Sequence, residues 1–497
     1  MERRAKIVAT LGPSTSTPER IHALLAAGVD VVRLNLSHGS HAEHRQRIRR
    51  VRAAAAALGR HVAVLVDLMG PRYRLGVVPE GTVLRQGATV RLGEPGRGVE
   101  LPVDDPGFLR HLRKGERLLI DNGRLELEVL GRSGRAVRAK VLFGGAVSTR
   151  KGINLPDTSL PFEVSAKDRA DVAFAVREGA DVLAASYIGR GRDVEAVRAV
   201  ARRAGRELPV LAKLERALAM EHLEEIIEAA DAVMVARGDL GVEVPLDRVP
   251  VLQKEIVAAG RLAGKPVVVA TQMLESMMSQ PRPTRAEASD VANAVFDGAD
   301  AVMLSGETAA GEFPLEAVRT MDRIVREAER YRWSPRGRDG WAARAARAAA
   351  GAPPMRPGQT EELNPRRDVH FEIPDIVCAA AVAAAARLDG AAIVAFSQGG
   401  FTARMIARHR PEAPVWVFTH DASVARRLQL VWGARPILLA ARPARVEEVV
   451  RIVDRELLAR ELARAGQPIV ILMGEPVLDR PLTNLMRVHR VRKSTGR

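Results

Sequence analysis

The chain has one cysteine, few aromatic residues and no long apolar run. Because Cys378 is alone among 497 residues, a disulfide framework is excluded, and the single thiol fits a reducing, cytoplasmic compartment. Aromatic residues make up 3% of the chain, too few for the stacking platforms that bind single-stranded nucleic acid. No stretch reaches the ~20 apolar residues of a membrane span, and Gly12-Pro13 cuts the first apolar run short, so neither a span nor a secretory signal is predicted.

Charge is plentiful and unbalanced, with a formal net charge of +16 at pH 7. Such an excess favours anionic partners, either polyanions or small ligands that carry phosphate and carboxylate groups. Many arginines lie in Ala/Arg stretches such as 342–350, which are typical of solvated helix surface. The charge alone therefore leaves the partner open.

Short apolar runs recur along the chain, and an amphipathic stretch usually follows each one. Apolar strands that alternate with helices predict a parallel sheet covered on both faces. Eight such units are the number that closes a (β/α)8 barrel. The runs begin at Lys6, Val29, His61, Asp181, Pro209, Asp231, Pro266 and Ala299.

The runs are evenly spaced except after the third. The long interval from Asp67 to Ser186 alternates apolar and polar residues between glycine turns, which predicts an inserted small β-barrel, or lid. Composition then shifts near Tyr331, and a second α/β pattern begins at Ile373. The predicted units are a barrel over 1–70 and 154–332, the lid over 71–153, a linker over 333–372, a C-terminal α/β domain over 373–491 and a basic tail over 492–497.

Polar and charged residues close the apolar runs, where the active site of such a barrel lies. Residues two apart share one face of an extended strand, which pairs Lys213 with Glu215 and groups Arg33 with Asn35 and Ser37. The other run ends supply Asp67, Gly238, Asp239, Thr271, Ser305 and Glu307.

This set of residues has a definite chemical character. Glu215 and Asp239 suit one hard divalent cation, of which Mg²⁺ is the first choice. Lys213 and Arg33 add fixed positive charge, and Gly238 and Asp239 can present backbone N–H groups to an anion at a helix start. Because no Ser-His-Asp set, Cys/His cluster or nucleophilic cysteine closes a run, phosphoryl transfer or enolate chemistry is favoured over acyl transfer.

Longer motifs resemble a known family. The chain contains KIVATLGPS, VVRLNLSHGS, DLMGP, KGINLP, KLE and MVARGDLGVEVP, and its longest block runs from Gly264 to Pro314. These motifs span nearly the whole chain and resemble those of the pyruvate kinases. The resemblance implies a β/α barrel with a lid inserted after its third strand and a C-terminal regulatory domain. It also implies phosphoryl transfer from phosphoenolpyruvate to ADP, which gives pyruvate and ATP at the end of glycolysis.

The resemblance assigns roles around the substrate. Lys213 matches the lysine that stabilises the transferring phosphoryl group and the enolate, and Arg33 matches the arginine at the substrate phosphate. Glu215 and Asp239 match the Mg²⁺ ligands, with Mn²⁺ able to substitute. Gly238, Asp239 and Thr271 match positions that hold the substrate, and Thr271 also lies near the enolate carbon that is protonated. For Glu307 two roles stay open, relaying a proton or orienting its neighbours. On the nucleotide side the resemblance gives Arg74, Lys151, His38 and Asn35.

Many family members also bind a monovalent cation, at positions that match Asn35, Ser37, Asp67 and Leu68. This chain departs from the family there, because Leu68 replaces a threonine and Arg72 replaces a glutamate. Members with a basic residue at the position of Arg72 tend not to need the ion, so we expect that K⁺ is not required. The alternative is that Arg72 turns outward and pairs with a lid carboxylate.

The resemblance further implies a homotetramer and allows a phosphorylated effector in the C-terminal domain. The loop that would bind it, 397–402, differs from the family pattern, so a tight turn without a ligand is an equal alternative. The sequence leaves two other functions as alternatives. A metal-dependent lyase or aldolase would need the same metal and lysine, but it has no use for the lid or Lys151. A polyanion-binding or RNA-binding protein would use the net charge, and nucleic acid is not the expected partner.

Overall fold

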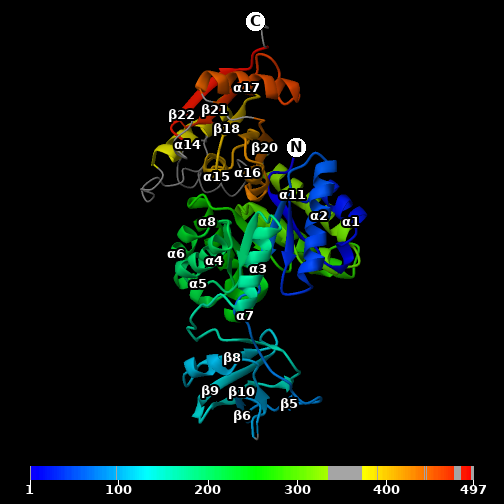
Figure 1. The fold of residues 1–497 in the computed structure, drawn as a ribbon, viewed down its shortest axis with the longest axis vertical. Helices are drawn as coiled ribbons and strands as arrows, with labels where there is room; N and C mark the ends of the chain where they lie inside the picture. The colour runs from blue at the N-terminus through cyan, green and yellow to red at the C-terminus, as the bar shows by residue number, and fades with distance from the viewer. Residues whose placement is uncertain are drawn as a thin grey trace, which may run out of the picture.

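The computed structural model describes residues 2–96, 98–333, 372–388, 390–440, 443, 445–474 and 483–493. Three units follow one another along the long axis of the molecule: the lid at one end, the barrel in the middle and the C-terminal domain at the other end (Figure 1). The predicted linker, except for its first and last residues, and most of the predicted tail lie outside the described residues.

Eight parallel strands close into the predicted barrel, in the order β1-β17-β16-β15-β14-β13-β3-β2. Apolar side chains such as Ala63, Leu65 and Met234 fill its interior, so the barrel is a packed core. The strands are β1 (Lys6–Thr10), β2 (Val31–Asn35), β3 (Ala63–Asp67), β13 (Val182–Ala185), β14 (Val210–Leu214), β15 (Ala232–Ala236), β16 (Val267–Ala270) and β17 (Ala301–Leu304).

Helices surround the barrel and cover the outer faces of its strands (Figure 1). The cap residues set where they begin: Thr284, for example, accepts from the backbone N–H of Glu287, whose carboxylate bonds back to Thr284. No helix in the described ranges has the length and apolarity needed to cross a bilayer. The longer helices are α1 (Pro18–Ala26), α2 (His41–Ala57), α3 (Ala166–Arg177), α4 (Gly191–Arg203), α6 (Leu223–Ala229), α8 (Val249–Leu262), α9 (Arg285–Asp297) and α11 (Pro314–Trp333).

The lid is inserted between β3 and α3. Its larger sheet has the order β4-β12-β8-β9-β10-β6-β7, and a small β11-β5 sheet accompanies it. A bridge between Leu75 and Val103 joins the two edges of the larger sheet, which gives the lid its barrel-like closure. Its strands are β4 (Tyr73–Arg74), β5 (Val83–Leu84), β6 (Thr89–Gly93), β7 (Leu101–Pro102), β8 (Arg117–Ile120), β9 (Leu125–Ser133), β10 (Ala136–Phe143), β11 (Gly145–Ala146) and β12 (Gly152–Asn154).

The C-terminal domain is an α/β unit with a sheet of order β20-β19-β18-β21-β22. The first four strands are parallel and β22 is antiparallel to β21. The strands are β18 (Ala392–Phe396), β19 (Val415–Thr419), β20 (Ala434–Leu438), β21 (Pro468–Met473) and β22 (Leu485–Arg490), and the helices are α14 (Glu372–Arg387), α15 (Phe401–Arg408), α16 (Ala422–Arg427) and α17 (Val446–Ala459).

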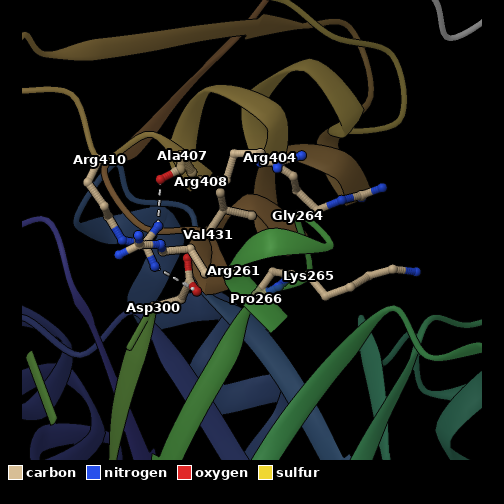
Figure 2. A pocket seen from close by; sticks show the side chains of 10 residues that line it. All are labelled: Arg261, Gly264, Lys265, Pro266, Asp300, Arg404, Ala407, Arg408, Arg410 and Val431. Atoms are coloured by element: carbon tan, nitrogen blue, oxygen red, sulfur yellow. Dashed lines mark hydrogen bonds and ion pairs between the residues drawn. The ribbon is translucent and has the colours of Figure 1, made fainter. Parts of the chain in front are cut away.

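This domain closes the end of the barrel opposite the lid. Leu430 is 3% exposed and belongs to the same apolar cluster as the barrel interior. Around it, the Asp300 carboxylate directly before β17 accepts from the Arg410 guanidinium at 3.1 Å (Figure 2). The same carboxylate accepts from the backbone N–H of Trp432 at 3.1 Å. The small cavity at this junction is lined mainly by basic side chains, and Asp300 is the acid among its lining residues. Buried apolar contact and buried ion pairs therefore join the two domains.

Candidate active site

Lys213 is the centre of the polar cluster at the lid end of the barrel. It lies near the end of β14, and its side chain is 10% exposed. Its Nζ donates to Ser186 Oγ at 2.7 Å and lies 2.7 Å from Glu215 Oε1 and 3.4 Å from Asp67 Oδ1. Burial disfavours the ammonium, but Asp67 and Glu215 outweigh it and hold the pKa of Lys213 above its ordinary value. The lysine is therefore a fixed positive charge.

Arg33 extends this cluster from β2, which pairs with β3, the strand of Asp67. Its Nε donates to Asp67 Oδ2 at 2.6 Å, and its Nη1 donates to Thr10 Oγ1 at 3.0 Å. Although Asp67 is 1% exposed and burial disfavours its charge, Lys213 and Arg33 hold the pKa of this carboxyl below its ordinary value. Asp67 thus fixes two cations at the mouth of the barrel.

Glu215 and Asp239 are the two carboxylates expected to hold Mg²⁺. Burial and the charge of Asp239 raise the pKa of Glu215 to about 7, although Lys213 and the backbone N–H of Tyr187, which donates at 2.7 Å, oppose this. Two carboxylates that repel each other fit a shared divalent cation. No group of three or more His, Cys, Asp or Glu side chains in the described ranges is arranged as a metal site. The pair suits Mg²⁺ in particular, because this ion keeps several positions for water and substrate.

Thr271 faces the start of α7 (Arg237–Glu243), as the run ends predict. Its Oγ1 accepts from the backbone N–H of Gly238 at 2.7 Å and donates to the Ala270 carbonyl at 2.6 Å. The hydroxyl is therefore held against the start of α7, where the sequence predicts that backbone N–H groups bind an anion.

Glu307 lies at the start of the short helix α10 (Gly306–Ala309), and it is 3% exposed. One of its oxygens accepts from the backbone N–H of Leu274 at 3.1 Å, and the other from that of Ser305 at 2.7 Å. These bonds tie the loop after β16 to the end of β17. They favour the orienting role over proton transfer.

The expected nucleotide-side residues lie in two places. Arg74 on β4 and Lys151, directly before β12, stand on adjacent lid strands, where Arg74 donates to the Arg150 carbonyl at 3.0 Å and Lys151 pairs with Asp121 at 2.9 Å. His38 is exposed on the loop after β2, on the barrel side. In the described residues, no hydrogen bond or ion pair joins these side chains to Lys213 or Arg33. The lid, which carries Arg74 and Lys151, lies at one end of the barrel (Figure 1).

The positions expected for a monovalent cation are already engaged within the chain. Asn35 Oδ1 accepts from the backbone N–H of Ser37 at 3.1 Å, and the Leu68 carbonyl accepts from Ser186 Oγ at 2.8 Å. Asp67 is held by Arg33 and Lys213, as described above. These hydrogen bonds orient oxygens that are expected to ligate the ion, and the requirement for K⁺ stays a prediction.

Comparison with known proteins identifies the family. Its barrel-domain model, described as "Pyruvate kinase, barrel domain", matches residues 2–318, and "Pyruvate kinase, alpha/beta domain" matches residues 375–489. The chain belongs to the pyruvate kinase family. It is 43% identical to a pyruvate kinase of Corynebacterium efficiens, over 100% of this chain and 99% of the relative. It is 42% identical to one of Mycobacterium tuberculosis, over 99% of each.

A solved pyruvate kinase of Cryptosporidium parvum has the same fold, with a TM-score of 0.84 at 31% identity, over 98% of this chain and 96% of that one. The predicted family, fold class and phosphotransferase activity are thereby confirmed. Pyruvate kinases are generally Mg²⁺-dependent, which agrees with the carboxylate pair described above.

Three residues make contacts in this site although no role is predicted for them from the sequence. Ser186 joins Lys213 to the Leu68 carbonyl, and Tyr187 gives its backbone N–H to Glu215 from a left-handed conformation with φ of 59°. Arg237 contacts the loop of Thr271. All three stand at or directly after a run end, so position in the barrel was the one signal that could have found them.

Proposed function

We propose that Lys213 and Arg33 stabilise the phosphoryl group of phosphoenolpyruvate while it passes to ADP. The supporting observation is that Lys213 Nζ is buried 2.7 Å from Glu215, whose carboxylate in turn interacts with that of Asp239. A charge that is already fixed needs no reorganisation when negative charge develops on the transferring group. In the reaction the bond from phosphorus to the enol oxygen breaks and a bond to an oxygen of the ADP terminal phosphate forms.

Glu215 and Asp239 would hold Mg²⁺, and Mn²⁺ is expected to substitute for it. When bound, the ion neutralises charge on phosphoryl and enolate oxygens. One Glu215 oxygen lies 2.7 Å from Lys213 Nζ, so the same carboxylate would hold both the ammonium and the ion.

Gly238, Asp239 and Thr271 would hold the substrate carboxylate. At present the Gly238 N–H donates to Thr271 Oγ1, so a carboxylate that enters must take over this donor. After transfer, the enolate carbon gains a proton on the side of Thr271, and pyruvate results. Glu307 keeps the two loops in place without entering the reaction.

Arg74, Lys151, His38 and Asn35 would face the nucleotide. Their place supports this proposal, because Arg74 and Lys151 belong to the lid, while Asn35 ends β2 and His38 lies on the loop that follows it. A diphosphate between the two units would meet cations from the lid. Closing the lid would then exclude water from the transferring group.

K⁺ would not be required. Arg72 supports this proposal. No carboxylate in the described part of the chain forms an ion pair with Arg72, whose charge instead acts on Tyr187 beside Glu215. A fixed cation at the barrel mouth can supply charge that the monovalent ion supplies elsewhere in the family.

Assembly, regulation, location and domain bounds stay predictions. We propose a cytoplasmic homotetramer with the domain bounds given above. The loop 397–402 leads into α15, and Thr402 Oγ1 lies 2.8 Å from Thr483 Oγ1, which leaves a phosphorylated effector and a ligand-free turn equally supported. If sugar phosphates and nucleoside monophosphates all leave the phosphoenolpyruvate saturation curve unchanged, the effector is excluded.

One coupled assay with phosphoenolpyruvate, ADP and Mg²⁺ tests the activity, with pyruvate reported through NADH oxidation by lactate dehydrogenase. We expect turnover that requires all three components. No turnover in this assay, together with metal-dependent cleavage of a 2-keto acid to pyruvate and an aldehyde, would support the lyase or aldolase alternative. Salt-sensitive retention on nucleic acid that phosphoenolpyruvate does not alter, with no turnover, would support the RNA-binding alternative.

A further inference from the structure

The loop after β16 holds two consecutive residues in a conformation that side chains rarely adopt. Thr271 has a φ of 68° and Gln272 a φ of 52°. For a β-branched residue such as threonine, positive φ is an outlier that the surrounding structure must enforce. Neither residue is a glycine, so the loop needs an external hold.

Arg237 supplies that hold from the first position of α7. Its Nη2 donates to the Thr271 carbonyl at 2.7 Å and to the Gln272 carbonyl at 3.2 Å, and it lies 2.8 Å from Met273 Sδ. Its Nε lies 3.4 Å from the Ala270 carbonyl. One guanidinium thus contacts consecutive carbonyls of the loop.

The guanidinium is fixed in turn from its other side. Its Nη1 donates to Asp290 of α9 at 2.7 Å and to Gln253 of α8 at 3.3 Å. The Arg237 side chain is 10% exposed, so these charge-assisted bonds form in a largely dry setting. Two outer helices are therefore linked through one side chain to the loop that carries Thr271.

We propose that Arg237 is a positioning residue, which sets the catalytic geometry of Thr271 by holding the loop 271–272 in its left-handed conformation. Arg237 points its side chain at carbonyls of the protein, while the next residue, Gly238, bonds the Thr271 hydroxyl. At the start of α7, the Arg237 side chain thus bonds the Thr271 carbonyl, and the Gly238 backbone bonds the Thr271 hydroxyl. The inference rests on the proposed role of Thr271 in the reaction.

Lysine cannot replace this arginine. A guanidinium presents five N–H donors in a planar fork, whereas an ammonium is a compact point charge with three. The contacts use two nitrogens of the fork: Nη1 bonds Asp290, and Nη2 bonds the Thr271 and Gln272 carbonyls. We therefore expect Arg237→Lys to keep the charge and lose the geometry.

The test compares Arg237→Gln, Arg237→Lys and Asp290→Asn with the wild type. Arg198→Gln is the matched control, because Arg198 is 11% exposed and pairs with Asp231 on the barrel periphery. For each variant we measure kcat, KM for phosphoenolpyruvate, KM for ADP, Tm, and hydrogen–deuterium exchange at the methyl group of pyruvate. The exchange reports the protonation step alone.

We expect Arg237→Gln to lose about 10- to 100-fold in kcat and in methyl exchange, the scale of a misplacement of about 1 Å, with KM for ADP unchanged. Arg237→Lys should lose nearly as much. Asp290→Asn, whose side chain is 35% exposed and which leaves the guanidinium in place, should lose about 2- to 10-fold. It keeps the proposal testable if the arginine variants fold poorly. Arg198→Gln should change Tm more than kcat.

A double-mutant cycle with Thr271→Val separates the possible failures. If Arg237 acts through Thr271, adding Arg237→Gln to Thr271→Val should cost little more than Thr271→Val alone. Additive losses, or full kcat and exchange in Arg237→Gln, would overturn the inference and leave the role of Thr271 standing. Normal turnover in Thr271→Val would instead refute the role of Thr271 and the inference with it.

Discussion

Lys213 Nζ lies 2.7 Å from Glu215 Oε1, and the two residues stand two positions apart at the end of one strand. Both side chains are buried, at 10% and 2% exposure. A buried charge whose partner is removed costs far more free energy than an exposed one. The pair is therefore electrostatically linked, and a change in either residue acts on the other.

Replacing Lys213 tests the electrostatic role of the lysine. Lys213→Met should lower kcat by at least about 10²-fold, because one preorganised charge is lost at the transferring group. Thermal unfolding followed by circular dichroism should show a folded barrel. Lys254→Met is the matched control, since Lys254 lies on the exposed face of α8 and should keep its activity. Near wild-type kcat in Lys213→Met would refute the assignment.

Replacing Glu215 tests the metal ligand. Glu215→Gln keeps the size of the side chain and removes its charge, so it should raise the Mg²⁺ concentration for half-maximal rate by at least about 10-fold. Glu243→Gln serves as the control, because Glu243 is buried on α7 and bonds to Asn154 of the lid, but it is no expected ligand. An equal shift in both variants would show that the effect is not specific to Glu215.

Arg72 tests the expected independence from K⁺. In tetramethylammonium buffer the wild type should have nearly the same initial rate with and without K⁺. Arg72→Glu changes the local charge from positive to negative and should make the enzyme K⁺-activated, whereas Arg72→Gln should lie between the two. Strong activation of the wild type by K⁺ would contradict the prediction.

Lys6 gives the folded protein a dependence on alkaline pH. It is 7% exposed and donates to the Ala434 carbonyl at 2.8 Å, and burial lowers its pKa from 10.5 to about 8, although Asp30 opposes this and Arg3, Arg435 and Arg60 add to it. The unfolded chain therefore binds this proton more tightly than the folded protein does. Below pH 8 the buried ammonium lowers the free energy of unfolding, and this destabilisation disappears as pH rises from about 8 to about 10.5.

Lys6→Met removes this titration. Across that pH range the wild type should gain stability relative to Lys6→Met, by an amount on the order of 2–3 kcal/mol. The measurement is the difference in Tm between the two proteins at a series of pH values in matched ionic strength. A difference that stays flat, or falls as pH rises, would contradict the prediction.

The barrel and the centre of its site could be predicted because both follow from simple periodicities. Apolar runs mark the strands, and a spacing of two residues puts Lys213 and Glu215 on one face. The hold of Arg237 on Thr271 could not be predicted. It depends on two residues with positive φ, which sequence does not reveal for non-glycine residues, and on a helix that is distant in the chain.

The bridge from Lys213 through Ser186 to the Leu68 carbonyl was missed for a related reason. It joins the ends of three strands, and its atoms meet only once the barrel has closed in register. Leu68 departs from the family pattern by lacking a hydroxyl, whereas its contact with Ser186 is made by its backbone oxygen. Side-chain identity predicts such backbone contacts poorly.

Leu430 makes the C-terminal domain part of the catalytic barrel's own interior. Its side chain shares a core with the strands whose opposite ends carry Arg33, Lys213 and Thr271. Interiors packed this tightly transmit displacement instead of absorbing it. A shift of the C-terminal domain would thus act on the barrel strands directly, through the interior packing at Leu430, as well as through the ion pairs around it.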